Sequence, residues 1–256
     1  EIMKELKAPA SKKIEYVDVY RFYVISAKLP ENVALYHDIP EAIWVVPNGE
    51  GESYLNAGAN RVIEAGDYPN LITARNAALD HCQKEEATYC FQADDDIERV
   101  FENTSHGLSG KKLRLKEVLY YYLNAADESG VELIGVPPTD NPFFARDEFK
   151  TNCFLIGNFF LCKPTHLRFD PSFKLKEDYD FTMQHIDAFG TVLRMNRYLM
   201  QFKHYKNKGG VVDYRTIELE KAACAQLVEK WGKWIRPHPK REGEVVLRGP
   251  RGKKAA

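Results

Sequence analysis

Residues 87–96 read ATYCFQADDD, seven mostly apolar residues followed directly by three aspartates. The apolar part contains the aromatic and small residues that form a buried β-strand. In open α/β sheets, ligands bind beyond the carboxyl ends of the strands. We therefore expect Asp94, Asp95 and Asp96 to lie at the mouth of a sheet, where a ligand would bind.

Strand-like and helix-like segments alternate on both sides of this stretch. The predicted strands are residues 17–26, 42–47, 61–64, 87–93, 131–136, 153–162 and 191–204, and the predicted helices are residues 71–82, 115–129, 179–190 and 219–231. This alternation predicts an α/β fold in a single domain, with a mixed, mostly parallel central sheet flanked by helices. Its 256 residues, 44% of them hydrophobic, suit one such domain.

The overall composition excludes several classes of protein. Lys and Arg total 36 against 37 Asp and Glu, so no global positive field indicates a nucleic-acid binder. The five cysteines form no C-x-x-C pair, which argues against a zinc ribbon and a disulfide framework and favours a reducing compartment. No apolar run reaches the roughly 20 residues of a membrane-spanning helix. We expect a cytoplasmic protein that does not enter a membrane.

The three consecutive aspartates have two interpretations. Adjacent carboxylates repel one another, and a divalent cation such as Mg²⁺ or Mn²⁺ removes that repulsion while taking further oxygens from water and a bound diphosphate. Alternatively, the aspartates cap the turn after the strand and are otherwise solvated. Both interpretations stay open at this point.

Other charged residues have similar pairs of interpretations. Glu177 and Asp178 open a predicted helix, where acids are ordinarily stabilising, but a carboxylate there could also act as a general base. The pair Arg75–Asn76 begins another helix, and the Arg75 guanidinium is either solvated or binds a diphosphate.

His204 precedes the loop 205–210, in which Lys206 and Lys208 could compensate phosphate charge. The histidine itself is either without a role or a ligand for Mn²⁺.

The end of the chain is strongly basic. From Trp231 onward, the sequence contains eight Lys and Arg residues but only two Glu residues, which is an excess of six positive charges. Such a segment is either solvated or contacts a polyanion. We therefore divide the chain into an extension at residues 1–16, a main domain at 17–232 and a basic segment at 233–256.

Taken together, these motifs resemble those of a known enzyme class. A strand ending in Asp-x-Asp, a later Glu-Asp at a helix start and a histidine before a flexible loop resemble the GT-A glycosyltransferases, which use nucleotide-sugar donors. More specifically, the chain resembles the TET/JBP-associated glycosyltransferases, which bacteriophages encode beside enzymes that hydroxylate thymine or 5-methylcytosine in DNA. The similar segments are residues 25–33, 74–79, 92–96, 175–182, 207–210, 230–232 and 239–247, and they span nearly the whole chain.

The resemblance implies a GT-A-like fold and a set of roles. Asp178 would be the catalytic base, and Asp94, Asp96 and His204 would bind Mn²⁺ or Mg²⁺. The donor-binding residues would be Ser26, Lys28, Arg75, Asn76, Asp94, Asp95, Lys206 and Lys208. The implied reaction moves a sugar from a UDP-sugar, with inversion at the anomeric carbon, to the hydroxymethyl group of a modified base such as 5-hydroxymethylcytosine in phage DNA. It would take place in the cytoplasm of the infected cell.

This sequence departs from the family pattern at two places. Ala93 precedes Asp94 and Asp95 where the family often has Ser-Asp-Asp, so which two of the three aspartates bind metal is open. The loop 27–29 lacks an arginine that is common there.

Two rival functions belong to other classes. A sugar-phosphate nucleotidyltransferase is also an acid-dependent and metal-dependent α/β enzyme, but it usually carries a glycine-rich phosphate loop near the first strand, and residues 26–32 contain no glycine. The second rival is a non-catalytic DNA-binding module, in which the acidic residues would have only a structural role. The near-neutral net charge and the lack of a helix-turn-helix or zinc signature argue against it.

Overall fold

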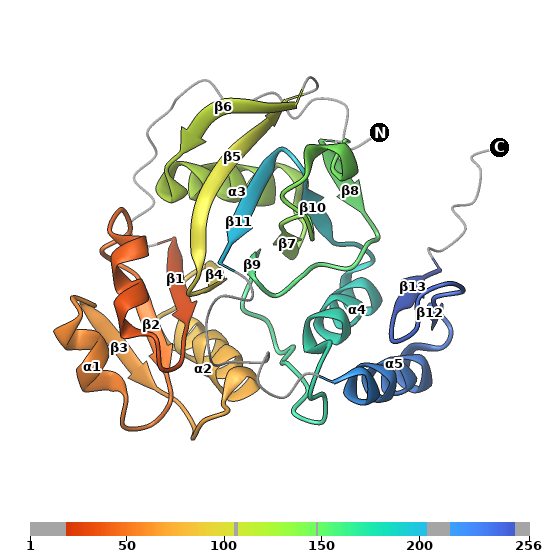
Figure 1. Cartoon of the computed structure of the whole chain (residues 1–256), viewed down its shortest axis with the longest axis horizontal. Helices are drawn as coiled ribbons and strands as arrows, with labels where there is room; N and C mark the ends of the chain where they lie inside the picture. The colour runs from red at the N-terminus through yellow and green to blue at the C-terminus, as the bar shows by residue number, and fades with distance from the viewer. Residues whose placement is uncertain (1–18, 105–106, 147, 204–215, 249–256) are drawn as a thin grey trace.

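The central sheet joins strands that lie between Tyr20 and Met195 in the sequence (Figure 1). The computed structural model describes residues 19–104, 107–146, 148–203 and 216–248. Within them, the sheet order is β3 (Arg61–Glu64), β2 (Ile43–Val46), β1 (Tyr20–Ile25), β4 (Tyr89–Asp94), β9 (Phe159–Cys162), β7 (Leu133–Gly135), β10 (Leu193–Met195) and β8 (Phe149–Thr151). Only β9 and β8 run against the others. The predicted α/β class with a mixed, mostly parallel sheet is confirmed.

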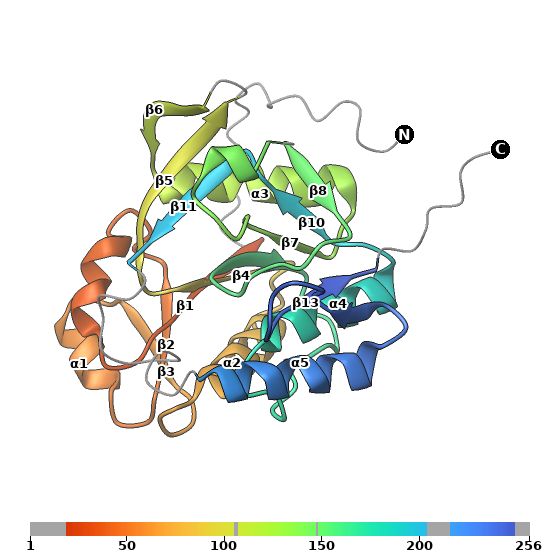
Figure 2. The same cartoon turned by 45° about the vertical axis from the view of Figure 1, so that its right-hand side comes forward.

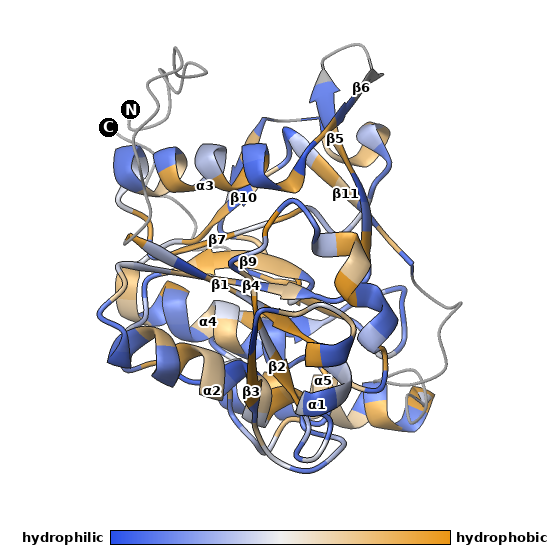
Figure 3. Cartoon of the chain, turned by 90° about the vertical axis from the view of Figure 1, so that its left-hand side faces the viewer, coloured by the Kyte–Doolittle hydropathy of each residue, from blue (hydrophilic) through white to orange (hydrophobic). Residues whose placement is uncertain are grey.

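Helices cover both faces of this sheet (Figure 2). Helix α3 (Leu115–Ser129) packs on one face, and α2 (Leu71–Lys84), α4 (Glu177–Phe189) and α5 (Ile217–Trp231) pack on the other. Because alternate strand residues point to opposite faces, Phe22 and Val24 join the core under α3, while Tyr23 and Ile25 join the other core. Because the strands are buried on both faces, their sequences are continuous apolar runs. In Figure 3 the central strands are largely orange, the colour of hydrophobic residues.

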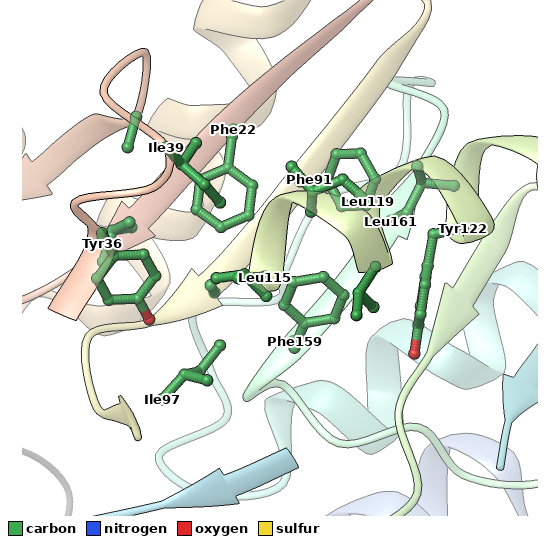
Figure 4. Close-up of a cluster of buried hydrophobic side chains, with 14 of the residues drawn as sticks. Phe22, Tyr36, Ile39, Phe91, Ile97, Leu115, Leu119, Tyr122, Phe159 and Leu161 are labelled. Atoms are coloured by element: carbon green, nitrogen blue, oxygen red, sulfur yellow. The ribbon is translucent and has the colours of Figure 1, made fainter. Parts of the chain in front are cut away.

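Aromatic side chains dominate the core under α3 (Figure 4). The ring centroids of Phe22 and Phe91 lie 6.0 Å apart, and those of Phe91 and Phe159 lie 5.9 Å apart. Tyr122 of α3 meets Phe159 edge to face at 5.2 Å. These ring contacts join β1, β4 and β9 to one another and to α3.

Two predicted strands differ from the structure. The segment 191–204 is broken at Asn196 and Arg197, so that its halves, β10 and β11 (Tyr198–Phe202), lie in different sheets. Strand β11 pairs with β5 (Ile97–Thr104), which pairs with β6 (Gly107–Leu113). The charged residues of β5 hide its strand character in the sequence. The segment 153–162 forms a strand only from Phe159 onward.

Several short elements have no counterpart in the prediction. They are the 3₁₀ helices η1 (Pro30–Tyr36) and η2 (Pro142–Phe144), the helix α1 (Gly51–Asn56), and the strands β8, β12 (Ile235–Pro237) and β13 (Val245–Leu247). Strands β12 and β13 pair with each other beside α5, and Ile235 and Val245 are buried in the core on that side. The described part of the basic segment therefore packs on the main domain. The proposed division at residue 232 stays a prediction.

A search for helices that could cross a membrane finds none within the described residues.

Candidate functional site

The aspartates lie at the carboxyl end of β4, as predicted. Strand β4 ends at Asp94, whose N–H donates to the carbonyl of Asn158 at 2.9 Å and whose carbonyl accepts from the Tyr36 hydroxyl. The side chain of Asp94 forms an ion pair with Arg75, with Nη2 3.0 Å from Oδ1. These contacts hold the end of the strand from three sides.

Ser26 connects the end of β1 to Asp95. Its hydroxyl donates to the Asp95 carboxylate and lies 2.6 Å from the hydroxyl of Tyr54 on α1. Burial raises the pKa of Asp95 to about 7, and the negative charge of Asp94 acts in the same direction. The structure thus brings together two of the residues that the resemblance assigned to the donor, and it adds Tyr54 to them.

Asp96 lies where β4, β5 and β11 meet. Burial, followed by the charges of Asp94 and Asp95, raises the pKa of Asp96 to about 7. The N–H of Lys203, just after β11, donates to the Asp96 carbonyl at 3.0 Å. The predicted ligand His204 and the predicted donor residues Lys206 and Lys208 lie outside the described residues.

Arg75 of α2 links the aspartates to the start of α4. Its side chain is 2% exposed, and its Nε lies 3.9 Å from Oε1 of Glu177 while Nη2 contacts Asp94. Within the described residues, Nε and Nη1 have no hydrogen-bond partner. A buried guanidinium with spare donors is suited to a second anion beside Asp94.

Gly157 makes this arrangement possible. A Cβ atom at residue 157 would lie 2.7 Å from Nη2 of Arg75 and 3.5 Å from the Cβ of Asp178. Any other residue at position 157 would therefore displace the Arg75 guanidinium. Sequence reasoning did not assign Gly157 to the site, although a glycine inside a predicted strand is a signal for a close approach of the backbone.

Asp178 lies in the first turn of α4 and is held by two backbone groups. Its Oδ2 accepts from the N–H of Gly157 at 3.0 Å, and its Oδ1 accepts from the N–H of Tyr179 at 2.8 Å. Burial raises the pKa of Asp178, while these hydrogen bonds and Arg75 oppose the increase. Burial and the charge of Asp178 raise the pKa of the adjacent Glu177 to about 7. Carboxylates with raised pKa values are suited to accept a proton near neutral pH.

Two other residues predicted to bind the donor, Lys28 and Asn76, contact different parts of the structure. The exposed Lys28 has a left-handed backbone, with φ of 62°, and its Nζ lies 3.4 Å from the ring centroid of Tyr68. Both polar atoms of the Asn76 amide pair with the backbone of Phe169, at 2.9 and 2.8 Å. Asn76 therefore ties α2 to the segment before α4 and does not join the group at the strand ends.

A search for metal centres finds no group of three or more His, Cys, Asp or Glu side chains arranged to hold an ion within the described residues. The half-buried carboxylates of Asp94, Asp95 and Asp96 are the candidates at the end of β4.

Comparisons with known proteins give only distant likeness. The chain matches no protein-family model and no curated protein. Among solved structures, it is similar to a CMP:2-keto-3-deoxy-manno-octonic acid synthetase solved with CTP, at 7% identity and a TM-score of 0.44 over 69% of this chain and 88% of that one. A cytidylyltransferase from Leptospira borgpetersenii is similar at 9% identity and a TM-score of 0.43, over 84% of this chain and 94% of that one.

A third similar structure is A197 from STIV. It has 11% identity and a TM-score of 0.38, over 75% of this chain and 98% of that one. Identities and TM-scores as low as these three do not assign a reaction.

Proposed function

We propose that this chain is a glycosyltransferase that uses a nucleotide-sugar donor and a divalent metal ion. The observation that carries the proposal is the position of Arg75 between Asp94, at the end of β4, and Glu177, at the start of α4. One buried cation thus connects an acidic group suited to a metal–diphosphate with Glu177, and the next residue, the half-buried Asp178, is suited to act as a base.

The metal would be held by Asp94 and Asp96. Mg²⁺ is typically bound through one or two carboxylates, with water and substrate phosphates completing its coordination, so a site with fewer than three protein ligands fits it. The mutual repulsion that contributes to the raised pKa of Asp96 would be relieved by a cation. His204 follows Lys203, whose N–H reaches Asp96, and is the proposed third ligand. When bound, the metal would neutralise the charge of the departing diphosphate.

Asp178 would take the proton from the acceptor hydroxyl as that oxygen attacks the anomeric carbon of the sugar. The bond between that carbon and the diphosphate oxygen breaks on the opposite side, and the nucleoside diphosphate leaves. The anomeric configuration is then inverted. The backbone hydrogen bonds from Gly157 and Tyr179 orient the Asp178 carboxylate and leave it lone pairs for the proton.

The segment after β1 favours glycosyl transfer over nucleotidyl transfer. A nucleotidyltransferase would use backbone N–H groups of this loop to bind a triphosphate. Here the N–H of Lys28 donates to the Glu50 carboxylate at 2.7 Å, and that of Leu29 donates to the Tyr54 hydroxyl at 3.1 Å. These two donors are already used by side chains of the protein and are not free to bind a triphosphate.

The donor nucleoside would lie over the ends of β1 and β4, in contact with Ser26, Lys28 and Asp95, and Lys206 and Lys208 would compensate its phosphate charge. The proposed acceptor is the hydroxymethyl group of a modified base in DNA. The sequence resemblance and the basic residues that follow α5 support this acceptor. Among them, Lys240 and Arg241 are exposed in the turn between β12 and β13.

The test is to incubate the protein with hydroxymethylcytosine DNA, Mn²⁺ and a panel of nucleotide sugars, and then to measure the mass of the DNA. A gain of one hexose with release of nucleoside diphosphate would support the proposal. Release of pyrophosphate from a nucleoside triphosphate and a sugar phosphate would instead identify a nucleotidyltransferase. Equal transfer to free nucleosides would overturn the DNA acceptor alone.

A further inference from the structure

Lys176, immediately before α4, combines two unusual features. Its backbone is left-handed, with φ of 62° and ψ of 26°, which is uncommon for a residue that is not glycine. Its side chain is nevertheless 7% exposed, although lysine is almost never buried unless it is paired. A strained backbone persists only where the surrounding structure holds it in place.

The buried ammonium group of Lys176 is held by the last part of the chain. Its Nζ lies 2.8 Å from Oε2 of Glu220 on α5 and 3.7 Å from Oε2 of Glu244, next to β13. It also lies 5.3 Å from the ring centroid of Tyr179 on α4. Two elements distant in sequence therefore anchor the residue that sets the direction of α4.

A second anchor lies on the other side of Asp178. The fully buried Asp180 accepts hydrogen bonds from Nε1 of Trp231 at 2.7 Å and from Nε2 of Gln184 at 2.8 Å. Nζ of Lys230 lies 2.9 Å from the same carboxylate. Residues 176 and 180 are thus both attached to α5, and Asp178 lies midway between them.

We propose that Lys176 is a positioning residue that acts through Asp178. Its ion pairs to Glu220 and Glu244 hold the left-handed turn that directs the Asp178 carboxylate to the N–H of Gly157. Helix α5 and the strand pair β12–β13 are then part of the unit that orients the base, besides any contact that they make with DNA. This inference rests on the proposed function of Asp178.

The charged groups that face Asp178 are Lys176 and Glu177 on its own segment and Arg75 on α2. Lys176 and Arg75 both lower the pKa of Asp178. Loss of Lys176 therefore moves the acidic limb of the pH–rate profile to higher pH, in addition to any loss of orientation.

The experiment compares Lys176→Met and Lys176→Arg with the control Lys221→Met. Lys221 also joins α5 to the segment between β12 and β13, through Glu242 at 2.7 Å, but this pair is exposed. The first readout is the hydrogen exchange of the Gly157 amide in the full chain without substrates. The second is kcat and donor KM as functions of pH.

We expect faster Gly157 exchange in Lys176→Met, recovery in Lys176→Arg and no change in the control. The kcat of Lys176→Met should fall by about 10-fold to 100-fold, with donor KM within about twofold of the parent. Unchanged Gly157 exchange in Lys176→Met would overturn the proposal.

A second variant and a readout that needs no sugar transfer keep the test decisive. If Lys176→Met does not fold, the variant Lys176→Met/Glu220→Gln removes both members of the closest pair, and parental exchange and kcat in that variant would also overturn the proposal. If the parent chain transfers no sugar, the proposed function fails, whereas the Gly157 exchange still decides whether Lys176 positions Asp178.

Discussion

Nη2 of Arg75 and Oδ1 of Asp94 lie 3.0 Å apart, so helix α2 and the end of strand β4 share an ion pair whose cation is buried. Arg75→Met should lower the free energy of unfolding by about 3 kcal/mol, the lower end of the range for a broken buried pair, because Asp94 is half-buried. Affinity for UDP should fall as well. Denaturant unfolding and calorimetry measure the two effects. The exposed pair of Arg114 and Glu117 is the control, and Arg114→Met should change stability by less than about 1 kcal/mol.

Asp96→Ala should abolish the part of UDP binding that depends on Mn²⁺, because it removes one of the two proposed carboxylate ligands. The fold should persist, since Asp96 is half-buried and its backbone carbonyl keeps the hydrogen bond from Lys203. Calorimetry with UDP, in the presence and absence of Mn²⁺, measures the effect. An equal gain of affinity from Mn²⁺ in variant and parent would exclude Asp96 as a ligand.

Asp178→Asn should reduce turnover by about 100-fold or more while UDP affinity holds, because the amide keeps the shape of the carboxylate but cannot act as a base. The amide nitrogen cannot accept a hydrogen bond, so one of the two backbone hydrogen bonds from Gly157 and Tyr179 is lost. Asp187→Asn, an exposed change in the last turn of the same helix, is the matched control. Steady-state rates measure both variants. Parental turnover in Asp178→Asn would leave Asp178 with a structural role at the start of α4.

Glu177 should make the stability of the protein depend on pH. Burial and the charge of Asp178 raise its pKa from the ordinary 4.5 to about 7 in the folded state. The folded protein then binds the proton more tightly than the unfolded chain. The free energy of unfolding should therefore decrease as the pH rises from about 4.5 to about 7, by about 3 kcal/mol.

Denaturant unfolding at several pH values measures this dependence. Glu177→Gln should reduce this dependence but not abolish it, because burial also raises the pKa values of Asp95 and Asp96 to about 7. The exposed change Glu229→Gln on α5 should leave the dependence unchanged. Equal slopes in parent and Glu177→Gln would show that Glu177 does not carry the effect.

Lys240→Glu/Arg241→Glu should raise the KM for DNA and leave the KM for the nucleotide sugar unchanged. Phosphate contacts release counterions, so transfer to DNA should also fall steeply with salt, whereas hydrolysis of the donor should not. Steady-state kinetics at several salt concentrations measure both effects. Lys84→Glu, at the end of α2, reverses an exposed charge elsewhere. If it raises the KM for DNA equally, the turn between β12 and β13 has no specific role.

Many of the strands and helices were predictable because local sequence patterns indicate them. The apolar runs of β1, β2 and β4 and the helical spacing in α2, α3 and α5 are repeated side-chain patterns that burial selects directly. The strand β5 was not predicted, because its charged residues mask the alternation and its partner β11 lies about 100 residues away. The short strands β12 and β13 were missed for a similar reason, since each is only three residues long.

The sequence by itself determined that three aspartates end a buried strand and that Glu177 and Asp178 begin a helix, because strand and helix ends are local properties of the chain. Only the tertiary structure decided which of these groups meet. The pairing of Arg75 with Asp94, the bond from Gly157 to Asp178 and the anchoring of Lys176 by Glu220 all join segments far apart in sequence. No periodicity or spacing encodes such contacts, because they arise only when α2, α4 and α5 pack together on one face of the sheet.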